Sequence, residues 1–153
     1  MGTFFLDSSS LVKPYIREIG TELVKEMVEP ENGNTILIAH IAQVEVAAAI
    51  SRRSKSGSVK LPDAENALAA FRFDLTNRYL TVDITTELLD FAMSLAIKHA
   101  LRGYDAVQLA AAIEANSELM ASGMSALMLI SADRELNEAA TAEGILFEDP
   151  NDQ

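Results

Sequence analysis

Short apolar runs alternate with longer amphipathic segments along the whole chain. Runs typical of strands cover residues 3–6, 36–39, 80–84, 127–130 and 145–147. Apolar residues recur at helical spacing in 11–16, 21–29, 41–53, 62–79, 86–99, 105–120 and 133–143. This alternation is typical of a parallel sheet covered by helices. It predicts one α/β domain over residues 1–148, with a central, mostly parallel sheet of four to five strands, and a frayed tail over 149–153.

The composition excludes several classes of protein. With 49% hydrophobic residues, the 153-residue chain has enough apolar side chains for one core. No apolar run approaches the ~18 residues of a membrane-spanning helix, and the start lacks the pattern of a signal peptide. The chain contains no cysteine, which excludes disulfides, thiolate metal ligands and cysteine nucleophiles. We expect a cytoplasmic protein that does not enter the membrane.

Two aspartates lie at or shortly after the ends of predicted strands. Asp7 follows the first strand and Asp133 comes shortly after the strand at 127–130, and both precede a helical segment. Ligands of parallel α/β sheets bind outside the carboxyl ends of the strands, so both acids are candidates for a site there. Either one could equally be an ordinary helix cap.

Two further acids lie within helical segments. The neighbours of Glu45 at helical spacing are all apolar, which places its carboxylate on a face expected to meet the core: Ile41, Ala42, Ala48 and Ala49. Burying a carboxylate without a partner is costly, so Glu45 needs a cation, a basic partner or an edge that reaches water. Asp105 opens the helix "DAVQLAAAIEA", where capping is an alternative role.

The four acids fit one shared pocket, because parallel crossovers bring strand ends and helix starts to one edge. At ~4 Å and an effective dielectric constant near 20, each pair of carboxylates repels by roughly 4 kcal/mol. Protons or a divalent cation would relieve that repulsion. Oxygen ligands without cysteine or clustered histidine favour a hard ion, Mg²⁺ or Mn²⁺.

The stretches that carry these acids resemble the PIN-domain family, in particular its VapC-type toxins. The matching segments are "FLDSSSLVKPYIREIG", "IAQVEVAAAISRRSKSG", "LRGYDAVQLAAA" and "ISADRELNEAATAEGI". The resemblance implies four catalytic residues, namely Asp7, Glu45, Asp105 and Asp133. Of these, Asp7, Asp105 and Asp133 would be metal ligands, and Glu45 would be a further ligand or would position water. Ser9 and Ser131 match the family's supporting hydroxyls and could equally be plain helix caps.

The same resemblance implies an activity and partners. The expected protein is a Mg²⁺-dependent, single-strand-specific endoribonuclease in which metal-activated water hydrolyses the phosphodiester, leaving a 3′-hydroxyl and a 5′-phosphate. It would be the toxin of a type II toxin–antitoxin pair, with a cognate antitoxin and a homodimeric assembly. No histidine base is then required, so His40 and His99 would be ordinary structural residues.

The net charge of −11 argues against a broad basic surface for nucleic acid. Any binding of RNA phosphates must therefore depend on a small number of basic residues close to the site. The candidate contacts are Lys13, Arg17, Arg52, Arg53, Lys55 and Arg102. The one dense basic run, "SRRSKSGSVK", could equally be a solvated helix end whose cations suit the helix C-terminus.

Two other functions remain open on the sequence alone. Asp7 after a strand also fits an α/β phosphohydrolase or receiver that is phosphorylated on this residue. Such domains often carry a second acid two positions later, where this chain has Ser9. The third alternative is a catalytically silent binding module with the PIN fold, although the presence of all four acids argues against it.

Overall fold

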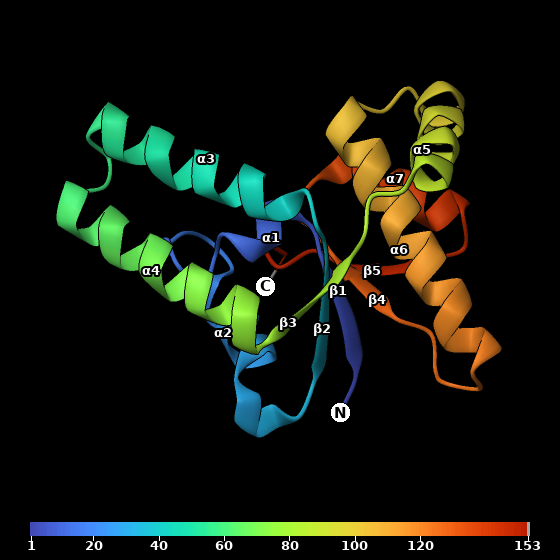
Figure 1. Cartoon of the computed structure of the whole chain (residues 1–153), viewed down its shortest axis with the longest axis horizontal. Helices are drawn as coiled ribbons and strands as arrows, with labels where there is room; N and C mark the ends of the chain where they lie inside the picture. Colours follow the sequence, from blue (N-terminus) through green and yellow to red (C-terminus); the bar gives the residue numbers. More distant parts are fainter. Residues whose placement is uncertain (153) are drawn as a thin grey trace.

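A five-stranded sheet forms the centre of the computed structural model, which describes residues 1–152 (Figure 1). The strand order is β3-β2-β1-β4-β5, and every neighbouring pair is parallel. The strands are β1 (Thr3–Leu6), β2 (Thr35–Ala39), β3 (Tyr79–Val82), β4 (Met128–Ile130) and β5 (Leu146–Glu148). This confirms the predicted α/β class and its parallel sheet.

Helices cover both faces of the sheet, so each face has its own hydrophobic core. The helices are α1 (Ser8–Leu11), α2 (Thr21–Val28), α3 (Ala42–Ser56), α4 (Leu61–Asn77), α5 (Thr86–His99), α6 (Gly103–Ala121) and α7 (Arg134–Ala142), with a 3₁₀ turn, η1 (Pro30–Asn32). Helices α1 to α4 pack on one face, and α5 to α7 pack on the other (Figure 1). None of the helices within residues 1–152 is long and apolar enough to cross a bilayer.

The sheet topology determines where a site can form. The chain leaves β1 to build β2 and β3 on one side, and later returns to build β4 and β5 on the other. Leu6 of β1 is in register with Ile130 of β4, so Asp7 and Ser131 leave the sheet side by side. The Asp7 N–H donates to the Ile130 carbonyl at 3.2 Å. In open parallel sheets this crevice between diverging strands is the usual binding site.

Several helix boundaries differ from the sequence prediction, and two of the differences lie near the acids. The helix expected over 11–16 is a single turn at Ser8–Leu11, followed by turns. Pro14 contributes to this early end because it has no N–H for a helical hydrogen bond. Helix α6 begins at Gly103, two residues before the predicted start, and this places Asp105 inside the first turn instead of at the cap.

The end of the described chain contacts the segment before α2. Pro150 is buried, and its carbonyl oxygen would lie 2.6 Å from a Cβ built on Gly20. Gly20 has a φ of 86°, a left-handed conformation that also favours glycine. Both conditions exclude a side chain at this position, so the close approach of the two segments requires Gly20. Of the tail predicted over 149–153, residue 153 lies outside the described residues.

Candidate active site

Asp7 lies at the carboxyl end of β1 and is 3% exposed. It caps α1, since its Oδ1 accepts hydrogen bonds from the Ser10 N–H at 3.1 Å and the Ser9 hydroxyl at 2.7 Å. Its Oδ2 accepts from the Ser131 hydroxyl at 2.6 Å. The helix-cap interpretation is therefore correct, but the carboxylate is also held from outside its own helix, because two donors lie in α1 and the third, Ser131, follows β4.

Ser131 and Ser9 connect the loops that follow β4 and β1. The Ser131 hydroxyl, which donates to Asp7, also accepts from the Asp133 N–H at 3.0 Å. The Ser9 hydroxyl accepts from the Ala132 N–H at 3.0 Å. Asp133 itself caps α7, because its Oδ1 accepts from the Leu136 N–H at 3.0 Å. Asp7 and Asp133 are thus held in one hydrogen-bonded cluster.

Helices α3 and α6 supply the other two acids. Glu45 lies in the first turn of α3 and Asp105 in the first turn of α6, and both side chains are partly buried. Gln108, one turn after Asp105, donates from Nε2 to the Glu45 Oε1 at 2.9 Å and to the Ser8 hydroxyl at 3.0 Å. Gln108 was not among the predicted site residues, although helical spacing places it on the same face as Asp105.

The electrostatics show that the four acids influence one another. Burial raises the pKa of Asp7 to about 6, with a further rise from Asp133 and an opposing effect of its three hydrogen bonds. Burial also raises the pKa of Asp105 to about 6, followed by repulsion from Asp133, Asp7 and Glu45, while Arg102 opposes the rise. The structure therefore brings the four predicted acids into one electronegative region.

The four carboxylates lie in one region, but they are not arranged as a complete set of metal ligands. Within residues 1–152, no group of three or more acidic or histidine side chains is arranged to hold an ion. The donor set nevertheless fits a hard cation, because all four side chains offer carboxylate oxygens. No lysine, arginine or histidine nitrogen of the described chain lies within 4.0 Å of any of these carboxylates. Their repulsion is therefore not relieved by a salt bridge inside this part of the protein.

A hollow of about 430 Å³ opens beside Glu45. Ser8, Ser9 and Tyr104 contribute to its lining, and Arg52 is the cation on its wall. Arg52 is exposed, and within residues 1–152 it makes no salt bridge. A cation beside an acidic region is the arrangement expected where a phosphate approaches a metal-binding site.

The structure corrects one of the predicted RNA contacts. Lys13 is 3% exposed, and its ammonium group donates to Glu18 at 2.9 Å and to the Ile19 carbonyl at 2.7 Å, so it cannot reach a substrate. Both acceptors lie within six residues of Lys13 along the chain, in the segment between α1 and α2. Arg53 also pairs with Glu18, at 2.7 Å.

The remaining predicted contacts lie on the surface. Arg17 is exposed and pairs with Glu22 at 2.7 Å. Lys55 is exposed near the end of α3, and Arg102 is exposed at the start of α6. Arg102 lines an apolar hollow of about 410 Å³ together with Tyr104.

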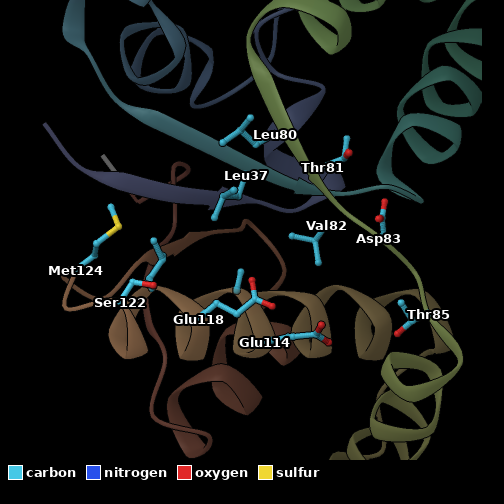
Figure 2. Close-up of a pocket in the computed structure, with 12 residues that line it drawn as sticks. Leu37, Leu80, Thr81, Val82, Asp83, Thr85, Glu114, Glu118, Ser122 and Met124 are labelled. Atoms are coloured by element: carbon cyan, nitrogen blue, oxygen red, sulfur yellow. The ribbon is translucent and has the colours of Figure 1, made fainter.

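A separate hollow of about 550 Å³ has none of the four acids in its lining. Figure 2 shows it between strand β3 and helix α6, with Glu114 and Glu118 projecting from the helix and Asp83 at one end. The two histidines also lie outside the acidic cluster. His40 is 4.0 Å from Asp83, and His99 bonds Glu143 at 2.7 Å.

The surroundings of Asp7 do not favour a phospho-acceptor. Ser9 occupies the position where such domains often carry a second acid, and its hydroxyl donates to the Asp7 Oδ1 at 2.7 Å. A phospho-acceptor of this class would therefore lack one of its acidic residues.

The comparison with solved structures finds the same fold throughout. The toxin VapC20 of Mycobacterium tuberculosis, which cleaves the sarcin–ricin loop, is 15% identical with a TM-score of 0.61, covering 94% of this chain and 96% of that one. VapBC2 of Rickettsia felis, bound to a promoter DNA fragment, is 14% identical with a TM-score of 0.60, covering 96% and 98%. FitAcB of Neisseria gonorrhoeae is 14% identical with a TM-score of 0.59, covering 98% and 99%.

The comparison by sequence places the chain in a family. No curated protein matches it significantly. The family model described as "PIN domain" matches residues 4–142, a range that contains all four acids. The all-parallel sheet is consistent with that match. The chain therefore belongs to the PIN domain family.

Proposed function

We propose that this chain is a Mg²⁺-dependent endoribonuclease that cuts single-stranded RNA and acts as the toxin of a toxin–antitoxin pair in the cytoplasm. The observation that carries the proposal is the cluster of four carboxylates without a salt bridge at the β1 and β4 ends of a PIN domain. VapC20, a structural neighbour of this fold, cleaves RNA at the sarcin–ricin loop.

Asp7, Asp105 and Asp133 would hold the ion, directly or through water, with Mn²⁺ as an alternative to Mg²⁺. A divalent ion in such a site lowers the pKa of a bound water and offsets charge on the phosphate oxygens. Glu45 would orient the attacking water or complete the ligand set. Ser9 and Ser131 keep the Asp7 carboxylate in one orientation through their hydrogen bonds. The chain thereby supplies positioned negative charge and needs no histidine base.

The assay that tests this function uses the purified chain, a single-stranded RNA and a matched RNA duplex. We expect cleavage of the single strand with Mg²⁺ or Mn²⁺, loss of cleavage with EDTA, and recovery when the metal is restored in excess. Product ends should be a 5′-phosphate and a 3′-hydroxyl. Cleavage that persists unchanged in EDTA, or no cleavage with either metal, would contradict the proposal.

Arg52 is the predicted RNA contact that the structure supports best, because it lines the same hollow as Glu45. One charge-assisted hydrogen bond contributes about 1.5–3 kcal/mol, so Arg52→Ala should raise KM about tenfold or more. The dependence of binding on salt should weaken as well, since one fewer phosphate is contacted. Arg72→Ala removes the same charge from an exposed part of α4 and serves as the control. Equal effects of both variants would show that only net charge matters.

Two assemblies belong to the proposal. VapBC2, whose fold is shared, was solved bound to promoter DNA, and an antitoxin would inhibit this chain by bringing a basic group towards the acids. A homodimer would cover apolar side chains of α5, of which Met93 and Ile97 are the most exposed. Light scattering on the chain, alone and with the product of a neighbouring small gene, measures both assemblies. If the chain is a monomer and binds no such product, the proposed homodimer and the proposed toxin role are both contradicted.

A further inference from the structure

Gln108 is a polar side chain in the buried, Ala-rich centre of α6. It is 2% exposed and lies one helical turn after Asp105, on the same face. Its Nε2 donates one hydrogen to Glu45 Oε1 at 2.9 Å and the other to the Ser8 hydroxyl at 3.0 Å. The amide therefore connects three elements, namely α6, the first turn of α3 and the start of α1.

The orientation of this amide is determined by its partners. Rotating it by 180° would direct its carbonyl oxygen at the Glu45 carboxylate, and the two acceptors would repel each other. With Nε2 directed to Glu45, the Gln108 Oε1 is buried and finds no hydrogen-bond partner among residues 1–152. A buried acceptor without a partner lowers stability. An apolar residue would suit these alanine and leucine neighbours better, so packing alone does not account for a glutamine here.

A neutral donor has a specific advantage beside Glu45. Lysine or arginine would also orient the carboxylate, but either would neutralise the charge that a cation site needs. An amide fixes one oxygen of Glu45 and leaves its net charge intact. The second contact, with Ser8, ties the same amide to the residue that directly follows Asp7.

We propose that Gln108 is a positioning residue that fixes the Glu45 carboxylate relative to Asp7 and Asp105. It leaves Glu45 Oε2 free to meet water or a cation. The inference rests on the proposed nuclease function, but it predicts metal binding as well as catalysis. Groups that orient metal-site residues in this way usually change affinity or activity about 10- to 100-fold when they are removed.

The test compares Gln108→Met, which keeps the length and removes the amide, with Gln43→Met as the matched control. We expect kcat to fall about 10- to 100-fold with KM for RNA within about twofold. The rise in Tm produced by Mn²⁺ should shrink, and Tm of the metal-free variant should stay equal or rise because the unpartnered oxygen is gone. Gln43→Met should match the wild type in all four quantities.

A second variant keeps the proposal testable if Gln108→Met does not fold. Gln108→Glu preserves shape but sets two carboxylates against each other, and should lose both activity and metal-free stability. The double variant Glu45→Gln with Gln108→Glu restores an amide–carboxylate pair, so the metal-free stability should return to that of the wild type. Its kcat should stay low, because the carboxylate is then at position 108 instead of position 45.

Three outcomes would overturn the assignment of Gln108. These are a wild-type kcat with a wild-type Mn²⁺ shift, a lower metal-free Tm with unchanged kinetics, and recovery of full activity in the exchanged pair. Failure of the nuclease proposal looks different, because then the unsubstituted chain does not cleave RNA with Mg²⁺ or Mn²⁺. In that case the Mn²⁺ shift of Gln108→Met against the wild type still decides whether this amide organises the acids.

Discussion

Asp105→Asn is expected to abolish RNA cleavage and, at the same time, to stabilise the metal-free protein. Asp105 is repelled by three other acids and makes no salt bridge in the described chain. Removing a metal ligand removes several kcal/mol of transition-state stabilisation, and about 4 kcal/mol corresponds to a loss of about 10³ in kcat. The neutral amide also removes one source of repulsion, so thermal unfolding without metal should occur at a higher temperature.

The opposite signs of the two effects make this variant informative. Circular dichroism and calorimetry measure the Tm in EDTA, and RNA cleavage is measured with Mg²⁺. Asp90→Asn, a surface substitution on α5, is the matched control and should change neither quantity. Asp7→Asn should lose activity to a similar extent, although its three hydrogen bonds make its stability effect smaller. Full cleavage by the Asp105 and Asp7 variants would exclude the proposed mechanism.

Without metal, the stability of the protein should fall as pH rises from about 4 to about 7. The folded-state pKa of Asp7 is raised from 3.8 to about 6, so in this interval the folded state binds more protons than the unfolded state. Stability therefore decreases with rising pH. A rise of this size corresponds to about 3 kcal/mol for Asp7, and Asp105 acts in the same direction with a smaller effect because it is more exposed.

Mg²⁺ should counter this loss, because it binds the ionised acids and stabilises only the folded state. Urea unfolding over the same pH interval, with EDTA or with millimolar Mg²⁺, gives the two slopes. The EDTA slope should become flatter in Asp105→Asn. Glu143 has the opposite effect on the pH dependence of stability. Hydrogen bonds from Lys98 and His99 lower its pKa, so its stabilising contribution is lost only as the pH falls below about 4.5. Metal-free stability that rises between about pH 5 and 7 would contradict the proposed acidic cluster.

The periodicity of the sequence was sufficient to predict the class of fold. Parallel strands all end at one edge, so acids placed directly after two of them had to lie at that edge. Asp7 and Asp133 follow this rule. The interpretation of Glu45 used a different signal, an acid surrounded by apolar residues at helical spacing, and the structure places it in contact with Gln108 of the same site.

Local helix geometry was predicted less well. Asp105 was expected to open its helix, with capping as an alternative to a role in the site, but α6 starts two residues earlier and Asp105 lies in its first turn. Lys13 was predicted among the basic residues that could contact RNA phosphates, but the structure buries it. Its burial depends on Glu18 and the Ile19 carbonyl, whose positions follow from a turn that the apolar pattern did not reveal.

The sequence by itself determined the parallel α/β architecture, because strand and helix periods are local properties of the chain. Its motifs resembled the family that the family model then showed. The four acids were predicted from strand ends, from helical spacing and from that resemblance. The resemblance also predicted Ser9 and Ser131 as supporting residues, but only tertiary structure revealed that Gln108 holds Glu45. Gln108 meets Ser8 across 100 positions and Glu45 across 63, and Ser131 meets Asp7 across 124. Such contacts depend on how two cores pack against one sheet, and no spacing within a single segment encodes them.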